Sequence, residues 1–444
     1  MKLIVLLMWF AIRFTVKCDL FHQKSYFNHK LYSIEIGDNR TTVELLNSML
    51  DKMDIDFWQE PGFGKSSVNC RVSPQFQSSL EQHLKDNYLP FKIIIENIQE
   101  IIDKEKIENN QILRNSYLTG RHDLDDFRLD YYHTYEEINN FMESMERRYP
   151  KIAKVITIGE TYEFHKIRAI KLGHNYNESK PVIWIDAGIH AREWIAPATA
   201  VYVIYKLAVK HEIDPEINKL LQTYNWYILP VVNPDGYMYS WWTNRLWRKN
   251  RALPKANPIR YPWKLFDECI GVDINRNFDI SFGGSSTSGN PCSEIFRGDY
   301  AFSEKESKAI RDTMLSLGSN VKAFLTLHSY SQMWMYPYGY TTTNKARNVD
   351  QLHNITKKII EAVKSKHGES YRYGPIATTI YPTSGSSPDW AHDFANITYS
   401  FIVELRDRGD NGFLLPRQYI LPTAEEIWEG IKIVASEINS RKNS

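Results

Sequence analysis

The sequence predicts an α/β protein whose main part has a mostly parallel central sheet covered by helices on both faces. From Tyr132 onward, short apolar runs bounded by polar or turn residues alternate with helical patterns. Buried strands separated by helices are typical of such sheets. Before that point, residues 25–115 alternate strand-like and helix-like stretches. That alternation predicts a separate α+β unit of about 90 residues, a size able to fold alone.

The small unit is expected to contain three strands and three helices. Leu31–Ile36 alternates like a strand, and Thr41–Glu44 opens a helix with capping-type residues. The remaining elements, in order, are the strand Ser67–Val72, the helix Pro74–Leu84, the strand Phe91–Ile95 and a polar helix over Ile98–Asn110. The segment Thr119–Arg128 is polar, carries Gly120 and lacks apolar periodicity, which is typical of a linker.

In the main part, three apolar runs are short enough to be strands. They are Val182–Ala187, Trp226–Val232 and Val321–Leu327, and the helical pattern Ala198–Lys210 lies between the first two. No internal repeat is present.

Composition excludes several classes of protein. The 444 residues include 54 basic and 53 acidic side chains, so the net charge of +1 gives no electrostatic footprint for nucleic acid. No block of like charge or low complexity indicates disorder. No apolar run reaches the roughly 18–20 residues that a membrane-spanning helix needs.

The N-terminus has the pattern of a secretory signal peptide. Lys2 precedes the apolar run Leu3–Ile12, and we expect residues 1–18 to be removed on export, with cleavage after Cys18. The alternative is a buried first strand or helix. The triplets at Asn39, Asn177, Asn354 and Asn396 match glycosylation sites and fit export, although such triplets also occur by chance.

The four cysteines are Cys18, Cys70, Cys269 and Cys292. Cys269 and Cys292 flank a short loop, so in an oxidising compartment we expect them to form a disulfide. The alternative is a pair of reduced, buried thiols. Cys70 has no obvious partner.

A possible metal site follows the run Val182–Ala187. His190 and Glu193 are three residues apart in the turn after it, with a helix expected to begin near Pro197, and both can reach one zinc ion. Such a pair is a weak signal by itself, and a catalytic zinc needs a third protein ligand. His328 at the end of the run Val321–Leu327 is a candidate, because α/β sheets place sites at strand ends. The alternative is that His328 is a hydrogen-bonded core histidine. Because the chain has 13 histidines, spacing alone does not identify the third zinc ligand.

A resemblance to a known family does identify the third ligand. The segments His190–Trp194 and His328–Ser331 resemble the zinc signature of the pancreatic-type metallocarboxypeptidases, and further motifs of that family follow in its order. These are Asn233–Tyr237, Asn244–Lys249, Gly271–Phe278, Tyr336–Tyr340, Thr379–Tyr381 and Glu404–Asp407. The resemblance runs from about Tyr132 to the C-terminus, and Asp56–Trp58 resembles part of that family's activation segment.

The resemblance implies a secreted exopeptidase that removes single C-terminal amino acids from peptides or proteins. It implies one Zn²⁺ per chain, held by His190, Glu193 and His328, and a mixed, mostly parallel sheet behind an open-sandwich activation domain. Glu404 matches the general base; its alternative role is a salt bridge with Arg406 or Arg408. Arg248 matches the residue that faces the scissile carbonyl oxygen. Its alternative is one cation of a solvated basic run with Arg245, Lys249 and Arg251.

Further matches assign the rest of the site. Asn275, Arg276 and Tyr381 match residues that bind the substrate's terminal carboxylate, for which a guanidinium fork is suited. Asp273 matches the carboxylate that orients a zinc histidine, here His190. The residues matching more distant substrate positions are Arg192, Ser329, Tyr330 and Phe413.

The specificity pocket is expected to be apolar. Basic-specific members of the family carry an acidic residue on its floor, where this chain has Pro388. Met335, Gly339, Ile380, Thr383 and Ile402 would form its walls, which predicts a preference for apolar or aromatic C-terminal residues. One extra residue between Trp390 and Glu404 leaves the neighbouring Asp389 as an alternative floor.

The resemblance also implies a zymogen. Residues 1–18 would be the signal peptide, 19–121 the activation domain with its connecting segment, and 122–444 the catalytic domain. A trypsin-like protease cutting near Arg121 would release a monomeric enzyme of about 320 residues, with neither nucleic acid nor membrane as a partner.

Two other functions compete with this one. A catalytically inactive relative acting as a binding protein would have lost a ligand or the general base, and none of the matched positions is lost. A zinc deacylase or aminopeptidase would not need the carboxylate-binding set Asn275, Arg276 and Tyr381. A serine hydrolase is disfavoured because no Gly-x-Ser-x-Gly segment is present.

Overall fold

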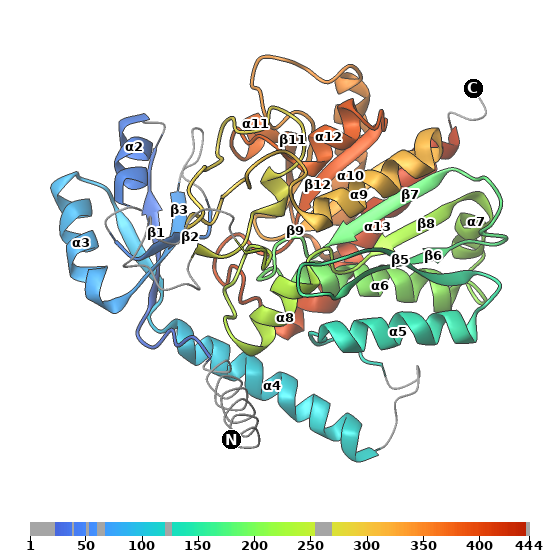
Figure 1. Ribbon diagram of the computed structural model, residues 1–444, viewed down its shortest axis with the longest axis horizontal. Coiled ribbons are helices and arrows are strands. Elements are labelled where there is room, and N and C mark those ends of the chain that lie inside the picture. Colours follow the sequence, from blue (N-terminus) through green and yellow to red (C-terminus); the bar gives the residue numbers. More distant parts are fainter. Residues whose placement is uncertain are drawn as a thin grey trace, which may run out of the picture.

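The computed structural model describes residues 23–37, 40–49, 53–59, 67–119, 127–253 and 269–440. They form two units, each built around its own sheet (Figure 1). We call residues 23–119 the N-terminal unit and residues 127–440 the main unit. In this part of the chain no helix is long and apolar enough to cross a membrane.

The N-terminal unit is a four-stranded antiparallel sheet in the order β2-β3-β1-β4. Its strands are β1 (Lys30–Glu35), β2 (Ile55–Phe57), β3 (Ser67–Val72) and β4 (Phe91–Ile95). The helices α2 (Arg40–Met49) and α3 (Gln77–Asp86) cover one face, where Tyr32 and Ile34 pack against Leu46 and Leu80. Because alternate residues of a strand point to opposite faces, Leu31 lies on the other face, towards the main unit.

The main unit has an eight-stranded mixed sheet in the order β11-β10-β12-β9-β7-β8-β6-β5. The strands are β5 (Ala153–Glu160), β6 (Lys166–Leu172), β7 (Val182–Ala187), β8 (Asn225–Leu229), β9 (Val321–His328), β10 (Met333–Tyr336), β11 (Arg372–Pro375) and β12 (Tyr399–Glu404). The central run β12-β9-β7-β8 is parallel, and the pairs β8-β6, β6-β5 and β10-β12 are antiparallel. The expected mixed, mostly parallel sheet is confirmed.

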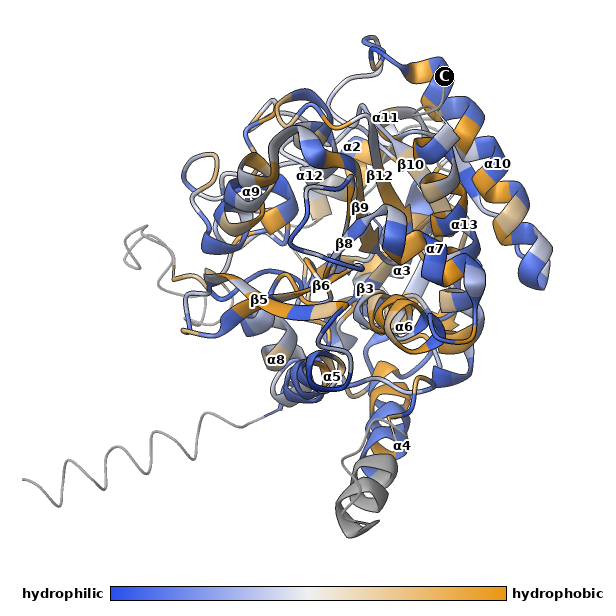
Figure 2. Ribbon diagram, turned by 90° about the vertical axis from the view of Figure 1, so that its right-hand side faces the viewer, coloured by the Kyte–Doolittle hydropathy of each residue, from blue (hydrophilic) through white to orange (hydrophobic). Residues whose placement is uncertain are grey.

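Helices cover both faces of this sheet. They are α5 (Tyr135–Arg148), α6 (Ile195–Lys210), α7 (Pro215–Thr223), α8 (Pro234–Trp242), α9 (Lys305–Leu317), α10 (Val349–His367), α11 (Ile376–Thr379), α12 (Ser387–Asp393) and α13 (Ile420–Ser440). Ile183 and Ile185 of β7 pack with α6 and α13, whereas Val182 and Trp184 pack with α9 and α12. In Figure 2 the central helix α6 is hydrophobic along most of its length, while α10 alternates hydrophilic and hydrophobic residues.

The parallel register brings the carboxyl ends of the central strands to one edge. His328 of β9 lies opposite Glu404 of β12, and Leu327 lies opposite Ala187 at the end of β7. Neighbouring strands are about 4.8 Å apart, so side chains that follow these ends can converge on one site.

Several details differ from the sequence-based expectations. The short strand β2 was not expected, because three residues are too few to show a period. The helix α4 (Ile98–Thr119) extends past Asn110 to Thr119, so Thr119 belongs to a helix and not to the linker. The helix α6 begins at Ile195, two residues before Pro197, so the proline stands within its first turn. The signal-peptide region, Asn39 and Arg121 lie outside the described residues.

The expected disulfide is present between Cys269 and Cys292. Cys70 is a free thiol buried in the core of the N-terminal unit. Cys18 lies outside the described residues. The disulfide anchors the segment that leads into Val272 and Asp273.

Candidate active site and metal centre

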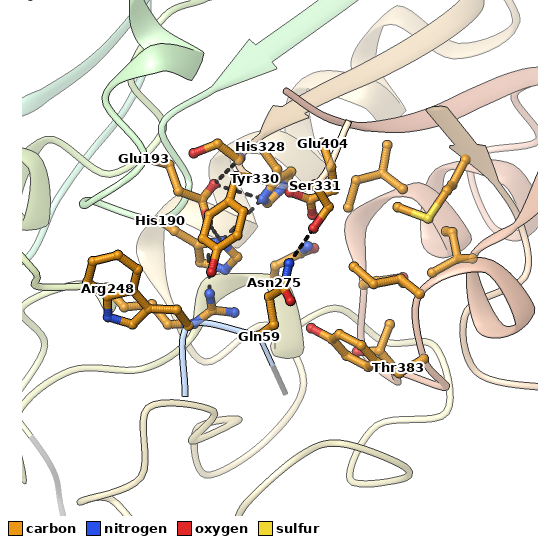
Figure 3. Close-up of a pocket in the computed structure, with 18 of the residues that line it drawn as sticks. Gln59, His190, Glu193, Arg248, Asn275, His328, Tyr330, Ser331, Thr383 and Glu404 are labelled. Carbon is orange, nitrogen blue, oxygen red and sulfur yellow. Dashed lines mark hydrogen bonds and ion pairs between the residues drawn. The ribbon is translucent and has the colours of Figure 1, made fainter. Parts of the chain in front are cut away.

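Three buried side chains present ligand atoms to one point at the carboxyl edge of the sheet (Figure 3). Nδ1 of His190 lies 2.8 Å from Oε1 of Glu193, and Nδ1 of His328 lies 3.1 Å from Oε2 of the same carboxylate. The two Nδ1 atoms are 3.2 Å apart. A tetrahedral zinc with bonds of about 2.0–2.1 Å holds its ligand atoms about 3.3 Å apart. The three side chains therefore fit a zinc ion, with room for one further ligand.

Local chain geometry explains why these side chains meet. β7 ends at Ala187, and Gly188 turns the chain with a φ of +65°, a conformation that glycine adopts at little cost. In the tight turn that follows, the amide of Glu193 donates to the carbonyl of His190 at 3.3 Å, which places both side chains on one side. His328 arrives as the last residue of β9, the parallel neighbour of β7.

The electrostatics favour an ionised Glu193. Burial by itself would raise the pKa of this carboxyl, but the adjacent imidazoles of His190 and His328 hold its pKa well below the usual range. A carboxylate in that state is the form that binds a cation.

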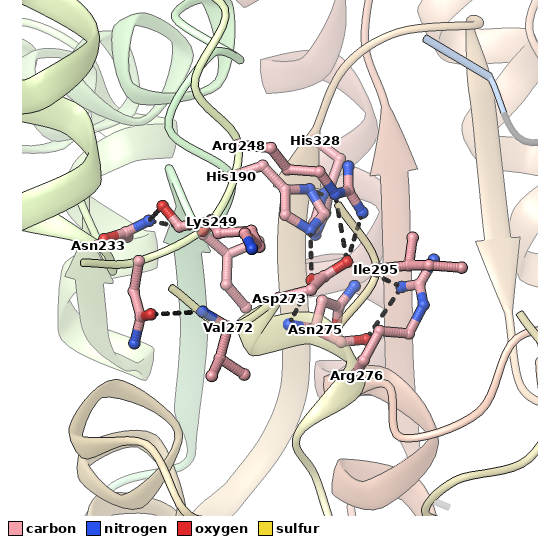
Figure 4. A network of polar contacts seen from close by, with 12 residues as sticks. His190, Asn233, Arg248, Lys249, Val272, Asp273, Asn275, Arg276, Ile295 and His328 are labelled. Atoms are coloured by element: carbon pink, nitrogen blue, oxygen red, sulfur yellow. Dashed lines mark hydrogen bonds and ion pairs between the residues drawn. The ribbon is translucent and has the colours of Figure 1, made fainter. Parts of the chain in front are cut away.

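Asp273 holds His190 from behind (Figure 4). Its Oδ1 lies 3.0 Å from Nε2 of His190, so Nε2 carries the proton and Nδ1 presents its lone pair to the ligand point. Its Oδ2 accepts hydrogen bonds from Nη2 of Arg248 at 2.8 Å and from Nε at 3.2 Å. Burial opposes ionisation, yet Arg248, Arg276 and His190 hold the pKa of Asp273 well below its usual range. Asp273 therefore fixes two side chains of the site at once.

A second group of polar side chains lies beside the triad. Oδ1 of Asn275 accepts the backbone amide of Ser387 at 2.8 Å, which turns its amide nitrogen towards the cleft. The guanidinium of Arg276 is anchored by Ser286 and by the carbonyl of Asn275, and its Nη2 lies 3.4 Å from the hydroxyl of Tyr381. These groups form a cationic, donor-rich patch suited to a carboxylate.

Glu404 ends β12 next to His328 and lines the same cavity. Arg406 instead bonds to Glu426, and Arg408 donates to the carbonyl of Ser370 at 2.6 Å. The structure therefore does not support the alternative role of Glu404, a salt bridge with one of these arginines.

The cavity that contains the triad continues into an apolar pocket. Its apolar wall is formed by Met335, Ile376, Ile380, Thr383, Pro388 and Ile402. Asp389, the alternative floor residue, is turned away from it, and its carboxylate accepts the backbone amides of Gly339 and Tyr340. Burial raises the pKa of Asp389 to about 7 despite these donors. Ile376 is a wall residue that was missed, whereas Gly339 packs behind the wall against Ile376 and Thr383.

The basic run around Arg248 is not a solvated face, so the structure does not support that alternative to the catalytic role of Arg248. Arg245 and Lys249 are 3% and 2% exposed. Lys249 donates to the carbonyl of Pro291 at 2.7 Å, and the Arg251 guanidinium stacks on Tyr239 at 3.7 Å. The segment that carries these basic residues is largely buried, and each of the cations contacts a partner there.

Residues of the N-terminal unit also reach the cavity. Trp58 and Gln59 line it, and Nε2 of Gln59 donates to Oγ of Ser331 at 2.8 Å. Asp56 accepts a hydrogen bond from Nη1 of Arg192 at 2.8 Å. Gln59 was missed because no local pattern distinguishes a glutamine that contacts another domain.

Arg192, Tyr330 and Phe413 meet at this contact between the units. The Arg192 guanidinium lies 4.2 Å from the centre of the Phe413 ring, and Tyr330 and Trp58 pack against the same ring at 5.1 Å each. A Cβ at Gly412, which has a φ of +58°, would lie 2.6 Å from the Trp58 ring, so only glycine permits this approach. Ser329 donates its amide to Glu193 at 3.2 Å and lines the cavity.

Comparison with known proteins identifies the family. The sequence model described as zinc carboxypeptidase matches residues 138–430, and the one described as carboxypeptidase activation peptide matches residues 32–105. The chain belongs to the zinc carboxypeptidase family. It is a metallocarboxypeptidase with an activation peptide, so it is made as a zymogen, acts on peptides and is activated by proteolysis.

Relatives match over nearly their whole length. The chain is 40% identical to carboxypeptidase A2 of Rattus norvegicus over 391 residues, 87% of this chain and 88% of the relative. It is 38% identical to carboxypeptidase A4 of Mus musculus over 418 residues, 93% and 94% of the two chains. The solved structure of thrombin activatable fibrinolysis inhibitor has a TM-score of 0.81 at 32% identity, covering 93% of this chain and 99% of that one. The solved structure of carboxypeptidase A from Helicoverpa armigera has a TM-score of 0.81 at 28% identity, covering 94% of this chain and 98% of that one.

Proposed function

We propose that this zinc carboxypeptidase is a secreted enzyme that releases apolar or aromatic C-terminal residues. Its signal peptide would be residues 1–18, its activation domain with the connecting segment 19–121, and its catalytic domain 122–444. The observation that carries the proposal is the placement of a metal triad, a donor-rich patch and an apolar pocket along one cavity.

The donor-rich patch selects a free C-terminus. Arg276 would bind the terminal carboxylate through its guanidinium, with Asn275 and Tyr381 adding neutral donors. Tyr381 lies only 3.4 Å from Arg276, so a carboxylate bound by one is within reach of the other. An enzyme acting on N-termini or on acyl groups has no use for this arrangement.

Each chemical role has a residue beside the triad. Zn²⁺ bound by His190, Glu193 and His328 would acidify a water and polarise the scissile carbonyl. Glu404, at the end of the neighbouring strand, would take the proton from the attacking water and deliver it to the leaving amine. Arg248, held by Asp273, would stabilise the negative charge that develops on the carbonyl oxygen.

The wall residues support the expected specificity. Met335, Ile380, Pro388 and Ile402 offer no charge to a lysine or arginine side chain, and burying an unpaired cation is costly. Because the Asp389 carboxylate is already bonded to two backbone amides, it would not act as the missing counter-charge. A large apolar side chain would gain about 1.5–3 kcal/mol from burial in such a pocket.

In the zymogen, the N-terminal unit would block the cleft at the positions used by longer substrates. Asp56 accepts a hydrogen bond from Arg192, and Gln59 donates one to Ser331. The Trp58 ring packs against the Phe413 ring. These contacts leave the triad itself untouched, so the block would be steric. A trypsin-like cut near Arg121 would free the unit, and the released enzyme would act as a monomer.

A peptide panel tests this function. The full chain, treated with trypsin, is given peptides that differ only in the C-terminal residue, with and without a zinc chelator. We expect release of Phe, Leu and Met, little release of Lys or Arg, no cleavage of C-terminally amidated peptides, and loss of activity with the chelator.

Each alternative predicts a different result. A preference for Lys or Arg would overturn the pocket assignment, and cleavage of amidated peptides would indicate another class of zinc hydrolase. A zinc-loaded, trypsin-cut protein without activity would indicate an inactive relative. Recovery of the protein from the medium of secreting cells, with residue 19 at its N-terminus, tests export.

A further inference from the structure

Asn250 is a buried residue, 1% exposed, that joins two segments of the active site. Arg248 lies two positions before it, and Asp273 lies one position after its main partner, Val272. The amide of Asn250 donates to the carbonyl of Val272 at 3.1 Å, and the amide of Val272 donates to Oδ1 of Asn250 at 2.8 Å. Main chain and side chain of one residue thus hold the same partner.

The side chain of Asn250 uses its full hydrogen-bonding capacity. Besides Val272, its Oδ1 accepts the amide of Ala252 at 3.3 Å. Its Nδ2 donates to Oε2 of Glu304 at 2.7 Å and to Oε2 of Glu306 at 3.1 Å. A carboxamide has two acceptor and two donor positions, and all four are filled here by groups of the required kind.

The two glutamates fix this side chain to a rigid element. Glu304 occupies the N-cap position of α9, and Glu306 stands in the first turn of that helix. Both are buried, at 7% and 1% exposure. A buried carboxyl needs a donor, and Asn250 supplies one to each. An apolar residue at 250 would remove this donor from both, and an aspartate would add a third carboxyl where donors are required.

The effect of Asn250 extends to the chemistry through Arg248 and Asp273. Figure 4 shows Val272 and Asp273 beside Arg248 and His190. Arg248 is held by Asp273 at its guanidinium and by Ala191 at its carbonyl, which accepts the Ala191 amide at 3.0 Å. If the two segments shift apart at residue 250, the guanidinium moves relative to the triad. A misplacement of about 1 Å can reduce a rate about 100-fold.

We propose that Asn250 is a positioning residue for Arg248, which clamps the Arg248 segment to the Asp273 segment and to α9. The inference rests on the proposed role of Arg248 in stabilising the developing oxyanion. It predicts that loss of the clamp lowers kcat, with little change in KM for a peptide whose terminal carboxylate is bound by Arg276.

The test measures kcat and KM on trypsin-activated full chain for N250A, R248A and the double variant. We expect N250A to lower kcat about 10- to 100-fold, and R248A to lower it about 100- to 1000-fold. Because Asn250 acts through Arg248, the double variant should be no slower than R248A. If the two losses multiply instead, Asn250 does not act through Arg248 and the proposal is wrong.

A remote variant controls for general destabilisation. Thr423 is fully buried in α13, where its hydroxyl donates to the carbonyl of Tyr419 at 2.6 Å. T423V removes a buried hydrogen bond without touching the site, so its kcat should equal that of the natural chain. An equal loss of kcat in T423V and N250A would overturn the positioning role.

A set of charge-complementary changes provides a rescue. N250D alone places an extra carboxyl against Glu304 and Glu306, and we expect it to be as slow as N250A or to fail to fold. N250D combined with E304Q and E306Q exchanges donors and acceptors among the three positions, because the new carboxamides at positions 304 and 306 can both donate to the new carboxylate at position 250. A folded triple variant that regains at least half of the natural kcat supports the clamp, whereas one as slow as N250A contradicts it.

The outcomes separate this inference from the proposed function. If R248A retains the natural kcat, the role of Arg248 is wrong and the proposed mechanism fails at that residue. If R248A is slow but N250A is not, the proposed function stands and only the positioning role fails.

Discussion

Asp56 of the activation peptide accepts a hydrogen bond from Nη1 of Arg192 in the catalytic cleft at 2.8 Å. Both residues are buried at the contact between the two units, and the Arg192 guanidinium also stacks on Phe413. Removing one partner of a buried ion pair leaves the other without compensation, which typically costs about 3–5 kcal/mol. The pair is therefore well placed to keep the zymogen closed.

The first prediction concerns this closure. Because the block lies at the positions used by longer substrates, we expect D56N to raise the activity of the uncleaved chain towards peptides of several residues at least tenfold, and to speed its activation by trypsin. Release of the C-terminal residue before and after trypsin treatment measures both effects. D54N is the matched control, since Asp54 pairs with Arg71 inside the N-terminal unit, 2.7 Å away. Equal activity of uncleaved D56N and D54N would contradict the role of the pair.

The second prediction concerns proton transfer. E404Q keeps the shape of the side chain but removes its basicity, so we expect kcat to fall by about 10²–10⁴ with zinc content unchanged. Metal analysis and steady-state kinetics on the activated enzyme provide the measurement. A loss of zinc together with activity would instead place Glu404 among the metal ligands.

The third prediction concerns zinc affinity. In D273N the His190 imidazole loses its charged acceptor, and such losses typically weaken metal binding about 10- to 100-fold. Competition with a chromophoric chelator measures the affinity. S286A provides the control. Ser286 contacts Arg276 through its backbone carbonyl, which the substitution leaves in place, so the zinc affinity of S286A should equal that of the natural chain. Equal zinc affinities of D273N and the natural chain would exclude the orienting role.

The fourth prediction concerns specificity. P388D places a carboxylate in the apolar pocket, in the first turn of α12, where an acidic residue is favourable. We expect the ratio of kcat/KM for C-terminal Lys over C-terminal Phe to rise at least 100-fold. P388N has nearly the same shape without the charge, so it should not show this rise. A ratio equally changed in both variants would show that shape, not charge, sets the preference.

The fifth prediction concerns stability and pH. Burial, and then the neighbouring Glu304, raise the pKa of Glu306 to about 8 in the folded chain, from an ordinary value of 4.5. Between these values the unfolded state gives up the proton that the folded state keeps. Glu306 therefore lowers the free energy of unfolding progressively as pH rises from about 4.5 to about 8.

E306Q removes this titration and keeps an acceptor for Asn250. We expect its Tm to exceed that of the natural chain at pH 8.5 and to approach it at pH 5, measured by calorimetry on the full chain. E361Q, at an exposed position of α10, should follow the natural chain at both values. A Tm difference between E306Q and the natural chain that does not grow with pH would contradict the assignment.

Much of the fold was predictable because period and run length are local properties. The strands Val182–Ala187, Ser67–Val72 and Phe91–Ile95 have the expected bounds. The strand β2 was missed because three residues are too few to show a period. The end of α4 was placed too early, because a polar helix past Asn110 lacks the apolar repeat that would indicate it.

The site was predictable only in part. The order of motifs identified the family, and the triad followed from it. The sequence did not separate Pro388 from Asp389 as the pocket floor, since adjacent residues differ only in where the backbone points them. It also left open whether the basic run is a solvated face, because a charge pattern does not show whether the segment carrying it is buried.

What the sequence by itself determined is the inventory of chemical groups, their order along the chain and the local elements that carry them. Only the tertiary structure decided which of them meet. His190 and His328 are 138 positions apart, and they touch because β7 and β9 are parallel neighbours that end at one edge. The clamp at Asn250 and the contact between Asp56 and Arg192 are of the same kind. Such contacts depend on strand order and domain packing, and neither leaves a periodic signal in the residues that form them.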